Sequence, residues 1–230
     1  MDDLNFNPAP KGYLFDMDGL LLDTERVGLQ AFLTVCEGYG IARVEAEPFF
    51  LSLIGGSQKV NAAKAEAYLA GRADVMRFGA EWNAQKQALM QADVPLRPYV
   101  REVIEGLSAS GMRMAVVTST LRDAAQHELK RAAILQHFVA VIAGDEVTAN
   151  KPDPAPYLQG AAALGLDPKD CAAFEDSDTG ITAAMRAGCR AVQIPDLRPD
   201  VPLPDLGQMV ARNLKEAVAM VSPVFARGFD

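Results

Sequence analysis

The chain has 230 residues, of which 50% are hydrophobic, so it can bury one good core and a smaller second one. Its formal net charge of -8 argues against a nucleic-acid or anionic-membrane partner, because such partners are held largely by clustered lysine and arginine. The three cysteines lie far apart without CxxC spacing, which argues against a disulfide framework or a zinc cluster.

The first ten residues contain neither a basic segment nor an apolar one, so we predict no signal peptide. No apolar run elsewhere reaches the length that spans a membrane. We therefore expect a cytoplasmic protein without a membrane partner. The sequence shows no heptad seam, and it is compatible with a monomer or a small homo-oligomer.

Short apolar runs alternate with helical patterns along most of the chain. In chain order, strands are predicted at 13–15, 112–117, 138–143, 171–174 and 191–194, and helices at 100–109, 122–133, 156–164, 179–187 and 213–220. This alternation predicts an α/β fold with a doubly wound parallel sheet.

Residues 24–96 depart from the alternation, because they carry helical patterns and no convincing strand. Helices are predicted at 27–39, 58–69 and 75–92, with Gly55 and Gly56 as a break between the first two. We therefore predict a helical domain, residues 23–96, inserted into an α/β domain formed by residues 1–22 and 97–230.

Polar side chains follow the predicted strands at their carboxyl ends, where open parallel sheets bind ligands. Clustered carboxylates are costly unless they are protonated or neutralised by a cation. Oxygen ligands suit Mg²⁺, which shares its coordination shell with waters and phosphate, so the pattern predicts phosphoryl transfer. The four segments are Asp16-Met17-Asp18-Gly19, Thr118-Ser119-Thr120, Lys151-Pro152 and Glu175-Asp176-Ser177.

Each of these segments has a simpler explanation when it is taken alone. Aspartate and glycine are usual turn residues, and Glu175-Asp176-Ser177 is also a suitable start for a helix. The coincidence of all four segments, in order and at strand ends, favours a functional site.

The four segments resemble the motifs of haloacid dehalogenase-like hydrolases, over nearly the whole chain. The matching stretches are FDMDG at 15–19, the strand that ends in Thr118, KPDP at 151–154 and FEDSDTG at 174–180. The stretches DTE at 23–25, LIGGS at 53–57 and ITAAMRAG at 181–188 resemble the branch with a helical cap, which includes beta-phosphoglucomutase and many sugar phosphatases. The resemblance implies a Rossmann-like core with a cap at 23–96. It also implies a substrate-sensing loop at Gly55 and Gly56, for which a simple turn between helices is an equal alternative.

The resemblance implies a two-step mechanism. Asp16 would attack phosphorus and form an aspartyl-phosphate. Asp18 would first protonate the leaving alkoxide and then deprotonate the incoming water. Thr118, the amide of Ser119 and Lys151 would bind the transferring phosphoryl group.

The resemblance also implies a magnesium site among the same residues. Mg²⁺ would be held by the Asp16 side chain, the Asp18 carbonyl and Asp176. Glu175 would be either a direct ligand or a residue that supports the ligands.

These roles predict a Mg²⁺-dependent phosphatase that acts on a small phosphorylated metabolite, such as a sugar phosphate. Asp18 argues against dehalogenase chemistry, because dehalogenases lack this acid. The mutase is an alternative, but its histidine and its cap arginine are replaced by Gly28 and Gln58 in a gapless alignment. A receiver-like phospho-signalling module is a further alternative, although receivers have neither the helical insert nor a second aspartate.

Overall fold

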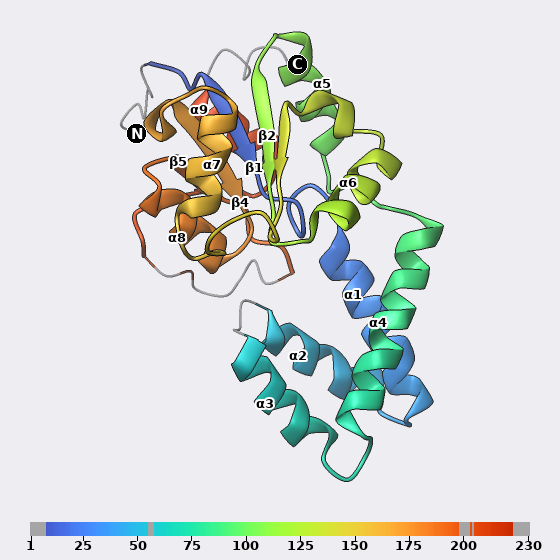
Figure 1. The fold of residues 1–230 in the computed structure, drawn as a ribbon. Helices are drawn as coiled ribbons and strands as arrows, with labels where there is room; N and C mark the ends of the chain where they lie inside the picture. The colour runs from blue at the N-terminus through green and yellow to red at the C-terminus, as the bar shows by residue number, and fades with distance from the viewer. Residues whose placement is uncertain (1–7, 55–57, 198–202, 204, 223–230) are drawn as a thin grey trace. The chain divides into compact units, whose positions relative to one another are not determined.

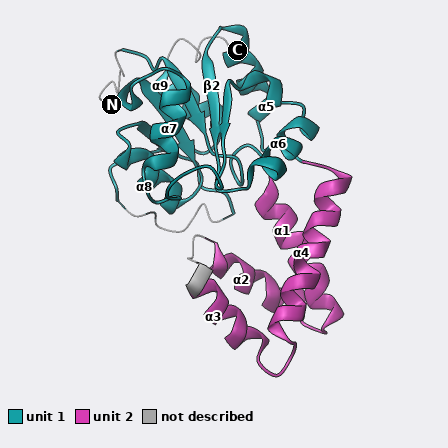
Figure 2. Ribbon diagram, viewed as in Figure 1, with its two compact units in different colours: residues 1–22, 95–230 teal, residues 23–94 magenta. Residues whose placement is uncertain are grey.

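A computed structural model describes residues 8–54, 58–197, 203 and 205–222 (Figure 1). The chain divides into two compact units, one formed by residues 1–22 and 95–230 and the other by residues 23–94 (Figure 2). The first unit is an α/β unit and the second is helical. Within the described ranges, every helix is too short or too polar to cross a membrane.

The α/β unit is built on a parallel sheet with the strand order β3-β2-β1-β4-β5-β6 among the described residues. From β1 the strands continue through β2 to β3 at one edge, and from β4 they continue through β5 to β6 at the other. The junction between β1 and β4 is therefore the topological switch point of a doubly wound sheet. This confirms the predicted fold class. The strands are β1 (Gly12–Phe15), β2 (Arg113–Val117), β3 (Ala140–Ile142), β4 (Cys171–Glu175), β5 (Arg190–Gln193) and β6 (Met209–Val210).

Helices cover both faces of this sheet. One face is covered by α7 (Ala155–Ala163) and α8 (Asp178–Arg186), and the other by α5 (Val100–Ala109) and α9 (Leu214–Val221). Because both faces are covered, β1 and β4 are buried at every position, which explains their continuous apolar runs. The unit also contains α6 (Arg122–Arg131) and two short 3₁₀ helices, Leu135–His137 and Pro168–Asp170.

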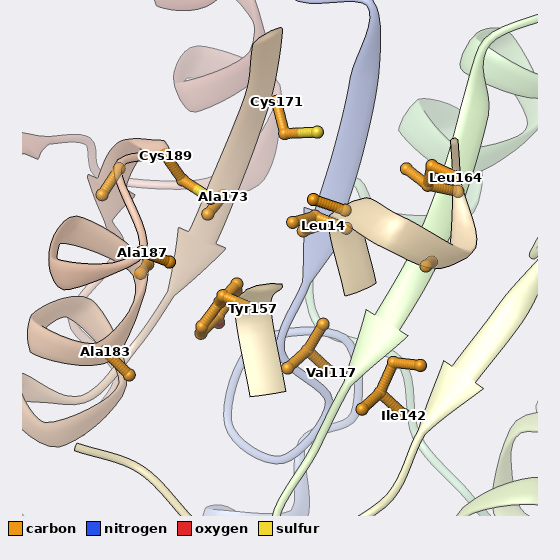
Figure 3. Close-up of a cluster of buried hydrophobic side chains, with 14 of the residues drawn as sticks. Leu14, Val117, Ile142, Tyr157, Leu164, Cys171, Ala173, Ala183, Ala187 and Cys189 are labelled. Atoms are coloured by element: carbon orange, nitrogen blue, oxygen red, sulfur yellow. The ribbon is translucent and has the colours of Figure 1, made fainter. Parts of the chain in front are cut away.

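Side chains of the core pack against both faces of β1. On one face Leu14 packs in a cluster with Val117 and Tyr157 (Figure 3). On the other face the rings of Phe15 and Phe174 stack with centroids 5.1 Å apart. Burying an aliphatic or aromatic side chain of this size contributes about 1.5–3 kcal/mol. The end of β1, where Asp16 follows, is therefore fixed by tight packing.

The part of the helical unit that the structure describes has four helices around an aromatic core. The ring of Phe32 contacts Phe50, Phe78 and Trp82, with centroid distances of 5.2 to 5.6 Å. The helices are α1 (Thr24–Gly38), α2 (Arg43–Leu53), α3 (Gln58–Leu69) and α4 (Val75–Ala92). The unit ends at Val94, two residues before the predicted end at 96. Leu96 and Arg97 pair with Leu22 and Leu21 of the α/β unit, which explains the earlier boundary.

Helix α2, strand β6 and both short 3₁₀ helices are absent from the sequence-based prediction. Helix α2 contains Pro48, which removes a helical hydrogen bond and normally opposes a helix interior. Its neighbours compensate by packing, since the Phe49 ring stacks on Tyr68 at 3.7 Å and Phe50 is buried. Strand β6 has two residues and is defined only by its pairing with β5.

Candidate active site

The chain turns tightly after β1, and this turn carries Asp16 and Asp18 at the switch point. The Asp16 amide donates to the Phe174 carbonyl of β4 at 3.0 Å, and the Asp16 residue is only 6% exposed. Gly19 adopts a φ of 80°, which favours glycine, and its amide donates to the Leu22 carbonyl. The turn brings Leu22 back beside Asp18, with which it forms a β-bridge.

Lys151 joins three strand ends through its ammonium group. Its Nζ atom forms an ion pair with Asp16 after β1 and lies 2.6 Å from Oε1 of Glu175 at the end of β4. The same atom donates to the Val117 carbonyl of β2 at 2.9 Å. The Lys151 side chain is 6% exposed, so these interactions are shielded from water. Removal of Lys151 would leave two buried carboxylates without their counter-charge.

For both Asp16 and Lys151, burial and the charge of the ion-pair partner shift the pKa in opposite directions. Burial raises the pKa of Asp16 well above its usual value, the Lys151 charge opposes the rise, and Glu175 and Asp18 add to it. Burial lowers the pKa of Lys151, but the two carboxylates Asp16 and Glu175 outweigh burial and raise it. Lys151 therefore remains a cation throughout the physiological range.

Glu175 is fully buried and has partners on both oxygens. Tyr157 donates to Oε1 at 2.5 Å, the oxygen that also contacts Lys151, and the Ser177 hydroxyl lies 3.4 Å from Oε2. A β-carbon at Gly180 would overlap the carboxylate, so any larger residue there would displace Glu175. Glu175 is thus held from several sides, with Oε2 the less occupied oxygen.

The loop after β2 supplies hydroxyl groups. Thr118 is buried, and its Oγ1 accepts from the Thr120 amide at 3.0 Å. The Thr120 hydroxyl donates to Oδ2 of Asp18 at 2.8 Å. Ser119 is exposed, and its carbonyl lies so close to Gly144 that a β-carbon there would overlap it. The loop is therefore fixed on both sides of Ser119.

Three carboxylates of this group are suited to a metal ion. Asp16, Glu175 and Asp176 each offer one carboxylate oxygen, and these oxygens lie within 4.8 Å of one another. Lys151 offsets only part of their negative charge. An all-oxygen donor set at strand ends fits Mg²⁺, which also retains waters and phosphate oxygens as ligands.

The family of haloacid dehalogenase-like hydrolases matches residues 13–194, which include all of these strand ends. The chain belongs to this family. The hydrolase is 34% identical over 196 residues to protein CbbY of Rhodobacter capsulatus, covering 80% of this chain and 85% of that protein. It is also 34% identical over 187 residues to the fructose-1-phosphate phosphatase YqaB of Escherichia coli, covering 80% of this chain and 95% of that protein.

A solved structure has the same fold as this hydrolase. It is a HAD-superfamily hydrolase from Geobacter sulfurreducens, with a TM-score of 0.71 and 18% identity, covering 95% of this chain and 98% of that one. Together with the relatives named as phosphatases, the family match supports assignment of the chain as a phosphoric monoester hydrolase.

The predicted site residues of the hydrolase fall into two connected groups within the α/β unit. Asp16, Lys151, Glu175 and Asp176 form the first group. The second group connects Asp18 through Thr120 to Thr118, and Ser119 lies in the same loop. Gly55 and Gly56, predicted to bind substrate, lie outside the described residues.

Two residues of the site had no predicted role. Thr120 lies in the polar segment after β2, so its type and position were visible in the sequence, but its contact with Asp18 was not. Tyr157 lies in an apolar helical pattern and gave no signal, because its ring packs in the core while its hydroxyl reaches Glu175.

Proposed function

We propose that the chain is a Mg²⁺-dependent phosphatase that hydrolyses a small phosphorylated metabolite, a sugar phosphate or a similar monophosphate, through an aspartyl-phosphate on Asp16. The observation that carries the proposal is the convergence of Asp16, Lys151 and the metal-suited carboxylates at the switch point. A buried carboxylate paired with a lysine is suited to accept a phosphoryl group, because the lysine offsets the negative charge that both reactants carry.

In the first step, an oxygen of Asp16 attacks phosphorus while the bond from phosphorus to the ester oxygen breaks. Asp18 donates its proton to the leaving alkoxide, which departs as an alcohol. The hydrogen bond from Thr120 holds the Asp18 carboxyl in place for this transfer.

In the second step, water attacks the aspartyl-phosphate. Asp18, now ionised, accepts a proton from that water, and the bond between phosphorus and the Asp16 oxygen breaks to release inorganic phosphate. Thr118, the Ser119 amide and Lys151 bind the phosphoryl oxygens during both steps.

The side chains of Asp16 and Asp176 and the Asp18 carbonyl would hold Mg²⁺. Oε2 is the oxygen that Glu175 can offer, because Oε1 already accepts from Tyr157 and contacts Lys151. When bound, Mg²⁺ supplies positive charge that offsets the phosphate and the carboxylates.

The relatives support a sugar phosphate as the substrate, since one of them is named as a fructose-1-phosphate phosphatase. Gly28 and Gln58, in place of the cationic cap residues of the mutase, favour hydrolysis of a monophosphate over a bisphosphate intermediate. The hydrolase family favours an enzyme over a receiver-like module. Three free, buried cysteines are in keeping with a reducing compartment such as the cytoplasm.

The test measures release of phosphate from p-nitrophenyl phosphate and from a panel of sugar phosphates, with Mg²⁺ and with a chelator. We expect turnover that requires Mg²⁺ and is abolished in Asp16→Asn. Asp123→Asn, which removes an exposed acid on α6, is the matched control and should retain activity. Acid-quenched enzyme should gain the mass of one phosphoryl group, and Asp16→Asn should not. Turnover in Asp16→Asn equal to that of the unmodified chain would refute the proposal.

A further inference from the structure

Two loops at neighbouring strand ends of the α/β unit lie in direct contact, the loop after β2 (118–121) and the loop after β3 (143–146). The Gly144 amide donates to the Thr120 carbonyl at 3.0 Å. A β-carbon at Gly144 would overlap the Ser119 carbonyl, so the two backbones are closer than a side chain would allow. The loop after β3 therefore supports the backbone that carries the Ser119 amide, which we assign to the phosphoryl group.

Side chains of the loop after β3 also bind the far end of the loop after β2. Leu121 precedes α6 and has no polar side chain to cap it, and the Arg122 amide donates instead to Oδ1 of Asp145 at 3.0 Å. The Arg122 guanidinium binds Glu146 at two points, through Nε on one carboxylate oxygen and Nη2 on the other. Such a contact fixes direction as well as distance, because the planar guanidinium matches the two oxygens. The Arg122–Glu146 pair therefore fixes the start of α6 against the loop after β3.

The Arg122–Glu146 pair is also bonded to the backbone at the edge of the sheet. Nη2 of Arg122 donates to the Val141 carbonyl of β3 at 3.0 Å, and Oε2 of Glu146 accepts from the Ala143 amide at 3.3 Å. Strand β3 is an edge strand in the described part of the sheet. The pair thus connects the end of the loop after β2 to the sheet itself.

The exposure of this pair argues against a role in stability alone. The Arg122 and Glu146 side chains are 36% and 31% exposed, and ion pairs that water screens contribute little to stability. The hydrogen bond from Arg122 lowers the pKa of Glu146, so the pair remains ionised at neutral pH. A pair with several directed contacts and a small expected effect on stability is suited to set the geometry of a loop.

We propose that Arg122 and Glu146 are positioning residues, which hold the loop after β2 in the conformation that binds a phosphoryl group. The inference rests on the proposed phosphatase function and adds two residues that act through the loop rather than on the substrate. On the near side of Ser119, the Thr118 amide donates to the Ile142 carbonyl of β3 at 2.9 Å. On the far side, the Arg122–Glu146 pair holds the loop after β3 in contact with the loop after β2.

Amide hydrogen exchange tests the positioning directly and requires no activity. In the full chain carrying Glu146→Gln, a donor replaces one acceptor oxygen, so the two-point contact with Arg122 is lost. We expect the amides of Arg122 and Gly144 to exchange at least about tenfold faster than in the unmodified chain, because both donate from one loop to the other. Unchanged exchange at both amides would overturn the proposal.

Inhibition by inorganic phosphate tests the consequence for binding. With p-nitrophenyl phosphate as substrate and Mg²⁺ present, the inhibition constant should rise at least about fivefold in Glu146→Gln and in Arg122→Gln, the effect of one misplaced hydrogen bond. The double variant should show no greater rise than either single variant, because the two residues act as one unit. Additive rises, or an unchanged constant, would overturn the proposal. A much larger rise in Arg122→Gln than in Glu146→Gln would also overturn it, since Arg122 would then bind phosphate itself.

Glu216→Gln is the matched control. Both carboxylate oxygens of Glu216 accept from Arg212, and the Glu216 side chain is 34% exposed, but this pair lies beside α9 and outside the two loops. Its loss should change the inhibition constant and the two exchange rates less than about twofold. Equal effects in Glu216→Gln and Glu146→Gln would reveal a general loss of stability and would refute a specific role for Glu146.

Folding and the parent activity are checked separately. If circular dichroism shows that Glu146→Gln is unfolded, Glu146→Asp replaces it, with changes expected in the same directions because the shorter side chain cannot reach Arg122 at two points. Absence of phosphate release from every ester by the unmodified chain would refute the phosphatase proposal. Hydrogen exchange, together with calorimetric titration with inorganic phosphate and Mg²⁺, would still decide whether the pair positions the loop.

Discussion

Tyr157 and Lys151 share one oxygen of Glu175. The Tyr157 hydroxyl donates to Oε1 at 2.5 Å, and the Lys151 ammonium lies 2.6 Å from the same atom. The ammonium also lies 5.4 Å from the centroid of the Tyr157 ring. A core side chain thus stabilises the position of the lysine that pairs with Asp16.

Tyr157→Phe should lower the free energy of unfolding by about 1.5–3 kcal/mol, the value of a hydrogen bond to a buried charged group. The ring and its packing are retained, so the loss reports the hydroxyl alone. Urea unfolding measures it. Tyr68→Phe is the control, since the Tyr68 hydroxyl is buried with no hydrogen-bond partner within the ranges that the structure describes. An equal loss in both variants would contradict the role of the Tyr157 hydroxyl.

For the sugar phosphate of the panel that the chain hydrolyses fastest, Thr120→Val should lower kcat/KM about tenfold, because Asp18 loses the donor that orients it and general acids contribute ~10²–10⁴-fold. For p-nitrophenyl phosphate the fall should be less than about threefold, since nitrophenolate departs without protonation. Thr120→Ser retains the hydroxyl and should restore most of the activity. Equal losses for both substrates would show that Thr120 does not act through Asp18.

Mg²⁺ should raise the Tm of the protein, because an ion that binds only the folded chain stabilises it. At ~100 times the dissociation constant the gain is about 2.7 kcal/mol, or about 5–10 °C for a chain of this size. Asp176→Asn should remove most of the shift, and Glu66→Gln, which neutralises an exposed acid on α3, should keep it. Differential scanning fluorimetry with and without chelator measures both. An undiminished shift in Asp176→Asn would place the ion elsewhere.

The cysteines should resist thiol reagents in the folded protein. Burial raises the pKa of Cys36 and Cys171 to about 11 and that of Cys189 to about 12. At pH 8 the reactive thiolate is then about one part in a thousand or less. A chromogenic disulfide reagent should react with the native chain only slowly, and with three thiols in denaturant. Ser110→Cys, at an exposed position, should react at once. Rapid native reaction of the original thiols would show that their segments open.

The structure changed the interpretation of residues whose partners lie far away in sequence. Lys151 is 135 residues from Asp16, and Tyr157 is 18 residues from Glu175. Whether a threonine hydroxyl meets Asp18, and which one, depends on side-chain rotamers that no local pattern specifies. The same holds for α2, where packing of Phe49 and Phe50 overrides the local effect of Pro48.

The sequence by itself determined the alternation of strands and helices, the helical insert and the chemical types at the strand ends. These follow from the order of residues along the chain, because strand and helix periods are local and parallel strands bring their carboxyl ends to one edge. The tertiary structure alone decided that Tyr157 supports Glu175 and that Thr120 holds Asp18. Each of these depends on close packing between segments, which fixes distances that residue order leaves open.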